Sequence, residues 1–304
     1  MATIDLKTLP KWKELPYGNH TLQIVARASE RGDSDKSEAV TFTTRKMTIS
    51  DTVNPRATRL TLDIYDGETL KNHIVYSITP GSYFMMPSLS DIQGTVRFIG
   101  WLDDGTFNAS DLSAITYGDG INPLSDRYGA VWQSATYASK DDVPLSMVID
   151  ETAKAFATVK FNFANVPEGT AQIYVLVSGY YPSAYNAFTM RPANAVTGLS
   201  AITTDLTSWT TTMFALKSGT TQMGLGFTFS ACDINGNELG ATEQIKVENV
   251  STETVTEVQA TFLAKLATPQ NVTANGTTVS WDPVENATSY AVLADGVSIG
   301  EVNS

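Results

Sequence analysis

The sequence predicts an all-β protein made of β-sandwiches, and three observations lead to this fold class. Apolar and polar residues alternate along many short segments, among them 60–64, 159–163 and 173–177, as in strands with one buried face. Turn-forming clusters such as YDGE, DDGT, NVPEGT, DINGN and ADGV separate these segments, and short strands at this spacing are typical of sandwiches. Helical periodicity is rare, so we expect helix only in short stretches around residues 7–14 and 109–115.

Composition narrows the functional classes. The chain has 304 residues, of which 42% are hydrophobic and 17% charged, so it can form two or three globular domains. Its formal net charge is −12, with no basic cluster, which disfavours binding to nucleic acid or to anionic lipid. A run of about 18 apolar residues would be needed to span a membrane, and none occurs. We therefore expect no nucleic-acid partner and no membrane insertion.

Residues that could carry catalysis or bind metals are few. Cys232 is the single cysteine, so it has no intrachain disulfide partner, and we expect a small, half-buried apolar residue. The two histidines cannot make a zinc site with it; we expect His20 at an inward strand position and His73 in a polar turn. Asp233 begins a turn that lacks the twelfth-position glutamate of a calcium loop. With no nucleophile elbow or phosphate loop either, we expect no enzyme, no catalytic residue, no metal and no cofactor.

Residues 265–304 carry a recognisable strand pattern, LATPQNVTANGTTVSWDPVENATSYAVLADGV. It resembles the first half, strands A to C′, of a bacterial or phage fibronectin type III domain. The resemblance implies that Val279 and Trp281 lie in the second strand and that Tyr290 and Val292 lie in the third. It also implies that these four residues belong to a domain core.

Residues 1–45 resemble the complementary second half, strands E to G, of the same domain. In the segment HTLQIVA, the resemblance implies that His20, Leu22, Ile24 and Ala26 face inward, and it places Val40 at the approach to the last strand. The family usually has tyrosine where His20 stands, which puts the hydrogen bond of the tyrosine corner in question. The two ends together thus resemble one split, immunoglobulin-like sandwich.

Neither half can bury its apolar face or pair its outer strands alone, so we expect the halves to meet. They can meet within one chain, between chains, or as the cut ends of a tandem array. We favour closure between chains, because a head-to-tail contact builds an open filament. The expected function is then a non-enzymatic structural subunit of an extracellular fibre, on a cell surface (a fimbria) or on a phage virion, that forms a homopolymer by strand complementation.

The middle of the chain is expected to form two further sandwiches, residues 46–148 and 149–264. The segments RLTLDIYDGETL, VRFIGWLDDGTFNASDL and MGLGFTFSACDINGNELG resemble the fimbrillin and minor-fimbrium proteins of Bacteroidetes. That resemblance implies two transthyretin-like sandwiches in a stalk, tip or anchor of a fimbria. It adds no catalytic signature.

Aromatic residues in this middle region leave an alternative function open. Tyr180, Tyr181 and Tyr185 cluster in sequence, and Trp132 lies in an earlier aromatic group. They can pack in cores and loops, or they can face a ligand and stack on a sugar. The alternative function is therefore a glycan-binding adhesion module with a host-surface glycan or protein as partner, and with the fibronectin type III domain closed within the chain.

Overall fold

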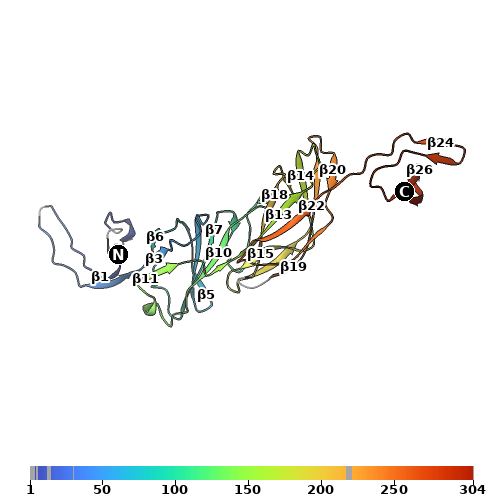
Figure 1. The fold of residues 1–304 in the computed structure, drawn as a ribbon. Helices are drawn as coiled ribbons and strands as arrows, with labels where there is room; N and C mark the ends of the chain where they lie inside the picture. Colours follow the sequence, from blue (N-terminus) through green and yellow to red (C-terminus); the bar gives the residue numbers. More distant parts are fainter. Residues whose placement is uncertain (1–3, 5, 12–14, 30, 217–220, 304) are drawn as a thin grey trace.

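The computed structural model describes residues 4, 6–11, 15–29, 31–216 and 221–303, with side chains from 224 onward in the last segment. The molecule is elongated, with β-rich units following one another from the N-terminal end to the C-terminal end (Figure 1). Its sheets pack face to face, which confirms the predicted all-β sandwich class. No helix in the described part of the chain is long and apolar enough to cross a membrane.

The first sandwich packs a five-stranded sheet against a three-stranded sheet. The larger sheet, in spatial order, contains β12 (Ala153–Lys154), β10 (Gly129–Gln133), β7 (Val96–Asp103), β4 (Arg59–Asp66) and β5 (Thr69–Ser77). The smaller sheet contains β11 (Ser146–Ile149), β3 (Lys46–Ile49) and β6 (Tyr83–Met85). Alternate residues of β3 and β4, such as Ile49 and Leu62, fill the space between the sheets with no exposed surface. The period-2 pattern therefore directs one face of each strand into this core.

The second sandwich has the same layered plan. One sheet contains β18 (Ser208–Phe214), β13 (Phe156–Ala164) and β22 (Thr256–Thr261). The other contains β17 (Leu199–Thr203), β14 (Gln172–Ser178), β19 (Thr221–Cys232), β20 (Glu238–Ala241) and β23 (Leu263–Ala264), with β21 (Ile245–Val250) also paired to β19. Phe161 of β13 packs between Phe227 and Phe229 of β19 at ring separations of 4.8 and 4.9 Å. These rings bind the two sheets together.

A shared sheet and a shared apolar cluster join the two sandwiches. The sheet contains β16 (Arg191–Val196), β15 (Tyr181–Asn186), β9 (Ile115–Tyr117) and β8 (Phe107–Asn108). Trp101, Phe107, Phe156 and Phe214 belong to one buried cluster that takes residues from both sides. β11 and β12, the last strands before the junction, pair with strands of the first sandwich. The chain thus passes from one sandwich to the other after Lys154, whereas the sequence pattern had suggested residues 148/149.

Separate hairpins form the two ends of the molecule. The N-terminal hairpin contains β1 (Gly18–Leu22) and β2 (Val40–Thr44), and only Arg45 separates β2 from β3. The C-terminal end contains two hairpins, β24 (Thr273–Asn275) with β25 (Thr278–Ser280) and β26 (Ser289–Ala294) with β27 (Val297–Asn303). They follow β23 through an exposed linker, and they lie at the far end of the molecule from β1 and β2 (Figure 1).

Helix is limited to two single turns in the described residues, the 3-10 helices Leu6–Thr8 and Lys140–Asp142. The expected helix at 109–115 is wrong, because that segment forms a turn and then enters β9. Of the other expected stretch, 7–14, the last three residues lie outside the described part of the chain. Ser139 caps the second 3-10 helix by accepting a hydrogen bond from the Asp141 amide, the usual role of an N-cap serine.

Candidate functional site

The N-terminal hairpin presents one apolar face. His20 pairs with Phe42 and Leu22 pairs with Val40 across the two strands, so all four side chains lie on the same side. The pairing extends beyond β1, because the amide of Ile24 donates to Ser37 Oγ at 2.9 Å. Ile24 is 58% exposed and Val40 is 63% exposed. The face predicted to be a domain core is therefore open to solvent in the single chain.

His20 forms the hydrogen bond that the sequence left in question. Its Nε2 atom lies 2.7 Å from the carbonyl oxygen of Pro16 and 2.9 Å from Thr44 Oγ1. Thr44 also donates to Pro16 O, at 2.9 Å, so His20 Nε2–H is placed to donate to the same carbonyl. A bond from this strand back to the preceding corner is the contact that the predicted fibronectin type III resemblance would assign to tyrosine. The resemblance itself stays a prediction.

The base of the hairpin is fixed to the first sandwich. Lys46 Nζ lies 5.6 Å from the ring centroid of Tyr17 and 4.6 Å from that of Tyr83, and a cation between two aromatic faces is attracted to both. Arg45 donates to the carbonyl oxygens of Val143 and Lys140 at 3.2 and 2.9 Å. These contacts orient the open face relative to the rest of the molecule.

The C-terminal hairpins also expose apolar side chains. Trp281 is half-buried and packs edge-on against Tyr290 with ring centroids 5.1 Å apart, and Tyr290 Oη accepts a hydrogen bond from the Val284 amide at 2.7 Å. Around this small centre, large apolar side chains remain exposed: Val272, Val279, Leu293, Val297, Ile299 and Val302. Val292 is half-buried, and none of these side chains belongs to the three buried clusters of the molecule.

The residues predicted to share one core are therefore divided between two places. His20, Leu22, Ile24, Ala26 and Val40 lie at the N-terminal end, and the Trp281 group lies at the C-terminal end (Figure 1). Within the described residues, no strand before β3 pairs with a strand after β23. In this conformation the two predicted halves do not meet within the described part of a single chain.

The two ends also differ in charge. Residues 1–45 contain seven basic and six acidic residues, whereas residues 265–304 contain one basic and four acidic residues. The N-terminal end therefore has a net charge of +1 and the C-terminal end one of −3, in a chain whose total is −12. Charges of opposite sign favour contact between unlike ends over contact between like ends.

Three of the four aromatic residues considered as ligand-facing are buried. Tyr181 and Tyr185 have no exposed surface and Trp132 is 4% exposed, so the sugar-stacking interpretation is wrong for them. Tyr181 Oη donates to the carbonyl oxygen of Thr212 at 2.6 Å, and Tyr185 packs on Phe214 in the junction cluster. Only Tyr180, at 77% exposed, remains accessible to a ligand.

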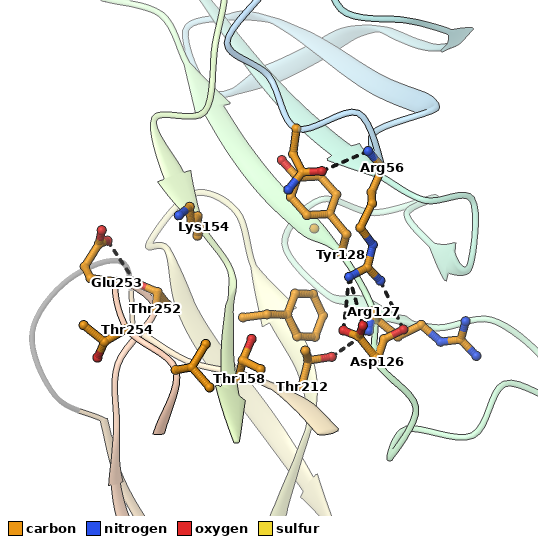
Figure 2. Close-up of a pocket in the computed structure, with 14 residues that line it drawn as sticks. Arg56, Asp126, Arg127, Tyr128, Lys154, Thr158, Thr212, Thr252, Glu253 and Thr254 are labelled. Atoms are coloured by element: carbon orange, nitrogen blue, oxygen red, sulfur yellow. Dashed lines mark hydrogen bonds and ion pairs between the residues drawn. The ribbon is translucent and has the colours of Figure 1, made fainter. Parts of the chain in front are cut away.

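A polar recess lies on the outer face of β13, where the two sandwiches meet. Its volume is about 220 Å³, and five segments line it: 54–56, 126–129, 154–158, Thr212 and 252–255. Figure 2 shows Lys154 and the loop Thr252–Thr254 on one side, the Arg56–Asp126 pair on the other, and Thr158 and Thr212 between them. No sequence motif marks this recess, because its residues come from segments that only the folded chain brings together.

Comparison with known proteins gives matches in structure alone. The chain matches no protein-family model, and no curated protein sequence matches it. Similar solved structures include a proposed adhesin from Bacteroides ovatus ATCC 8483 (10% identity, 71% of this chain and 92% of that chain, TM-score 0.44). A proposed cell adhesion protein from Bacteroides uniformis ATCC 8492 matches at 12% identity, over 80% of this chain and 96% of that chain, with a TM-score of 0.44. The fimbrial anchor protein Mfa2 from Porphyromonas gingivalis matches at 10% identity, over 66% of this chain and 82% of that chain, with a TM-score of 0.40.

These neighbours are Bacteroidetes fimbrial and adhesin-like proteins, the group that the middle region resembles in its strand and turn pattern. Similarity at this identity and with TM-scores below 0.5 identifies neither a family nor a function for the chain. A functional proposal therefore rests on the residues of this chain.

One histidine–carboxylate pair has the geometry of a catalytic dyad. His73 Nδ1 lies 2.6 Å from Asp63 Oδ1, and Tyr65 Oη donates to Asp63 Oδ2 at 3.0 Å. Burial raises the pKa of the Asp63 carboxyl above its ordinary value. No serine or cysteine contacts His73 in the described residues, so the pair lacks a nucleophile. The expected polar turn at His73 is wrong, since it lies in β5.

Cys232 lies deeper than the sequence suggests, whereas the turn after it forms as expected. Cys232 is 4% exposed where a half-buried position was expected, and burial raises the pKa of its thiol. Asp233 Oδ1 accepts hydrogen bonds from the amides of Asn235 and Asn237 at 2.8 and 2.9 Å. Its carboxylate thus closes a hairpin turn. In the described residues, no group of three or more metal-ligating side chains forms.

Gly129 provides a test of the junction between the sandwiches. A Cβ atom at this position would lie 2.5 Å from two ring carbons of Trp101 and 2.9 Å from one of Phe156. We expect Gly129→Ala to destabilise the protein by about 1–3 kcal/mol, because the rings have no free space. Urea unfolding measures this change. The control is Gly300→Ala, where a Cβ atom meets nothing within 4 Å, so the unfolding midpoint should not change. Gly105→Ala does not serve as a control, because Gly105 has a φ of +87°. Equal midpoints for the parent chain, Gly129→Ala and Gly300→Ala would contradict the expectation.

Proposed function

We propose that the protein is a non-enzymatic structural subunit of an extracellular fibre that associates head to tail. In this proposal the C-terminal hairpins of one copy cover the apolar face of the N-terminal hairpin of the next copy. The observation that carries it is the presence of two exposed apolar hairpin surfaces at opposite ends of one elongated molecule (Figure 1). The fibre is a fimbrial or virion component located on a cell or particle surface.

Within the described residues, β1 and β2 pair only with each other, and each C-terminal hairpin is likewise an isolated pair of strands. Isolated two-stranded hairpins are marginal in water, and their open edges accept further strands. A contact between different surfaces at opposite ends leaves both outer ends free, so it propagates into a polar filament. The unlike charges of the two ends favour the same orientation.

Closure within one chain is the competing arrangement. It would require the C-terminal hairpins to fold back along both sandwiches, whose shared sheet and buried junction cluster form one continuous unit. The linker between β23 and β24 is short, residues 265–272. The position of the two ends therefore favours closure between chains. In a tandem array, the same contact would form between neighbouring units of one continuous chain.

The experiment is a mixing assay with two truncated chains. One lacks residues 265–304 and the other lacks residues 1–45, so each keeps only one of the complementary ends. Light scattering should show concentration-dependent polymers for the full chain, no polymer for either truncated chain, and 1:1 dimers for their mixture. Negative-stain microscopy of the full chain should show filaments. A monodisperse full-length monomer at all concentrations would refute head-to-tail association.

A matched pair of point variants separates the interface from general changes to the hairpin. Leu22→Asp places a charge on the apolar face, whereas Thr21→Asp places it on the opposite, exposed face of the same strand. We expect Leu22→Asp to prevent polymerisation and Thr21→Asp to leave it intact. Equal behaviour of the two variants would show that this face is not the contact surface.

A further inference from the structure

The recess at the junction of the sandwiches has the size of a site for one small ring. Its volume of about 220 Å³ lies below the roughly 300–1,000 Å³ of pockets that hold drug-sized ligands. It is therefore suited to one monosaccharide-sized unit rather than to an oligosaccharide lying flat. Because the strands β10 and β13 that help to line the recess lie between the two ends of the molecule (Figure 1), a ligand there can be the terminal residue of a longer glycan chain.

The lining offers polar groups that no other residue satisfies. Lys154 Nζ and the hydroxyls of Thr158 and Thr254 line the recess, and none of the three makes a hydrogen bond or ion pair within the described part of the chain. The carboxylate of Glu253, which accepts from Thr252 Oγ1 at 3.2 Å, keeps further lone pairs for a ligand. Donors, acceptors and hydroxyls thus occur together, as a polyhydroxylated ligand requires.

The surroundings of the recess hold it in one shape. Asp126 accepts both hydrogen bonds from Arg56 Nη1, at 3.1 and 3.2 Å, and the Arg127 amide donates to Thr212 Oγ1 at 2.8 Å. Below them, Phe156 is 7% exposed and stacks on Phe214 at 4.5 Å, giving an apolar floor. A polar site on a rigid base loses little ordering entropy when a ligand binds.

We propose that this recess binds a single sugar residue of a glycan. The lining carries both signs of charge, with Arg56, Arg127 and Lys154 against Asp126 and Glu253, and Arg56 pairs with Asp126. This near balance of charge favours a neutral polyol over a strongly charged ligand. A sugar ring can place an apolar face towards Phe156 and its hydroxyls towards Lys154, Thr158 and Glu253. This binding activity is independent of head-to-tail association, since the recess lies away from both end surfaces (Figures 1 and 2).

The test is saturation-transfer NMR on the full chain with the methyl glycosides of glucose, galactose, mannose, fucose and N-acetylglucosamine. We expect at least one to bind, with a dissociation constant on the order of 1 mM, typical of a few hydrogen bonds. Lys154→Met and Thr158→Val should each weaken binding about two- to tenfold, the effect of one lost hydrogen bond. Thr254→Trp should abolish binding by filling the recess from its exposed rim.

Controls keep this result separate from folding and from polymerisation. Lys160 lies on the same strand as Thr158, but it pairs with Glu257 at 3.9 Å and does not line the recess. The Lys160→Met variant should therefore bind sugar as the parent chain does. The non-polymerising Leu22→Asp variant should also keep its sugar affinity. The proposal is overturned if no glycoside shows saturation transfer, or if binding persists unchanged in Thr254→Trp.

Discussion

Trp281→Ala is expected to weaken association between the ends of two full-length chains by roughly a hundred- to a few-thousand-fold. Replacing a buried aromatic residue by alanine costs about 3–5 kcal/mol, and each 1.4 kcal/mol corresponds to about a factor of ten in affinity. Trp281 is half-buried in the single chain and packs only on Tyr290 among the aromatic rings. Its remaining surface would become buried when the neighbour's N-terminal hairpin covers it. Sedimentation velocity over a concentration series measures the change.

Two further measurements show whether the weaker association of Trp281→Ala comes from the contact between the ends or from a general loss of stability. Tyr180→Ala removes an aromatic side chain that is 77% exposed and distant in sequence from both ends, so association should be unaffected. The unfolding midpoint of the two sandwiches should be the same in Trp281→Ala and the parent chain, since Trp281 belongs to none of their buried clusters. If Trp281→Ala associates as strongly as the parent chain, the C-terminal hairpins are not the donor surface.

The all-β class could be predicted because most strands have one buried and one exposed face. Along β13, Val159 and Phe161 are fully buried while Thr158 and Lys160 between them are partly exposed, so the alternation is directly visible in the sequence. Each hairpin turn adds a local signal, such as the Asp233 carboxylate that closes the DINGN turn. Such signals depend on neighbours in the chain and need no knowledge of the folded structure.

The interior of the junction could not be predicted, because its strands do not have one buried and one exposed face. β15 is covered on both sides, with Tyr181 and Tyr185 fully buried, so it has no alternation and resembles an exposed aromatic loop in the sequence. The recess beside it combines Lys154, Thr158 and Thr212 with loops far apart in the chain. No spacing between these residues is characteristic, because tertiary packing alone brings them together.

The two ends of the molecule could be predicted only in part. The alternation in residues 20–26 and around Trp281 indicates strands with an apolar face, and the structure forms hairpins there. The surface that covers each apolar face belongs to a partner, so it depends on contacts beyond the local sequence pattern and beyond the fold of one chain. The sequence also could not show that His20 reaches Pro16 O, since that contact depends on the geometry of the preceding corner.

The second large effect concerns the buried ion pair of Arg59 and Asp103. Asp103 has no exposed surface, and Arg59 Nε and Nη2 both donate to its carboxylate at 3.0 Å. Burial raises the pKa of Asp103 to about 6, although the Arg59 charge opposes the shift. We expect Arg59→Met to destabilise the protein by about 3–5 kcal/mol at pH 8, the usual cost of leaving one buried charge without its partner.

The loss should depend on pH, with a definite sign. The pKa of Asp103 is higher in the folded state than the value near 4 of an unfolded aspartate, and without Arg59 it rises further. Between these two pKa values the native state binds more protons than the unfolded state, so stability falls as pH rises through that window. Arg59→Met should therefore cost less at pH 5, where Asp103 can be protonated, than at pH 8.

Urea unfolding of the parent chain and Arg59→Met at pH 5 and pH 8 measures both effects. Lys160→Met is the control, because Lys160 and its partner Glu257 have side chains that are 39% and 60% exposed, and exposed pairs contribute about 0–1 kcal/mol. Adding Asp103→Asn to Arg59→Met should remove most of the difference between the two pH values, since no titrating group then remains buried at this site. An equal loss at pH 5 and pH 8 in Arg59→Met would mean that Asp103 reaches solvent or another cation once Arg59 is gone.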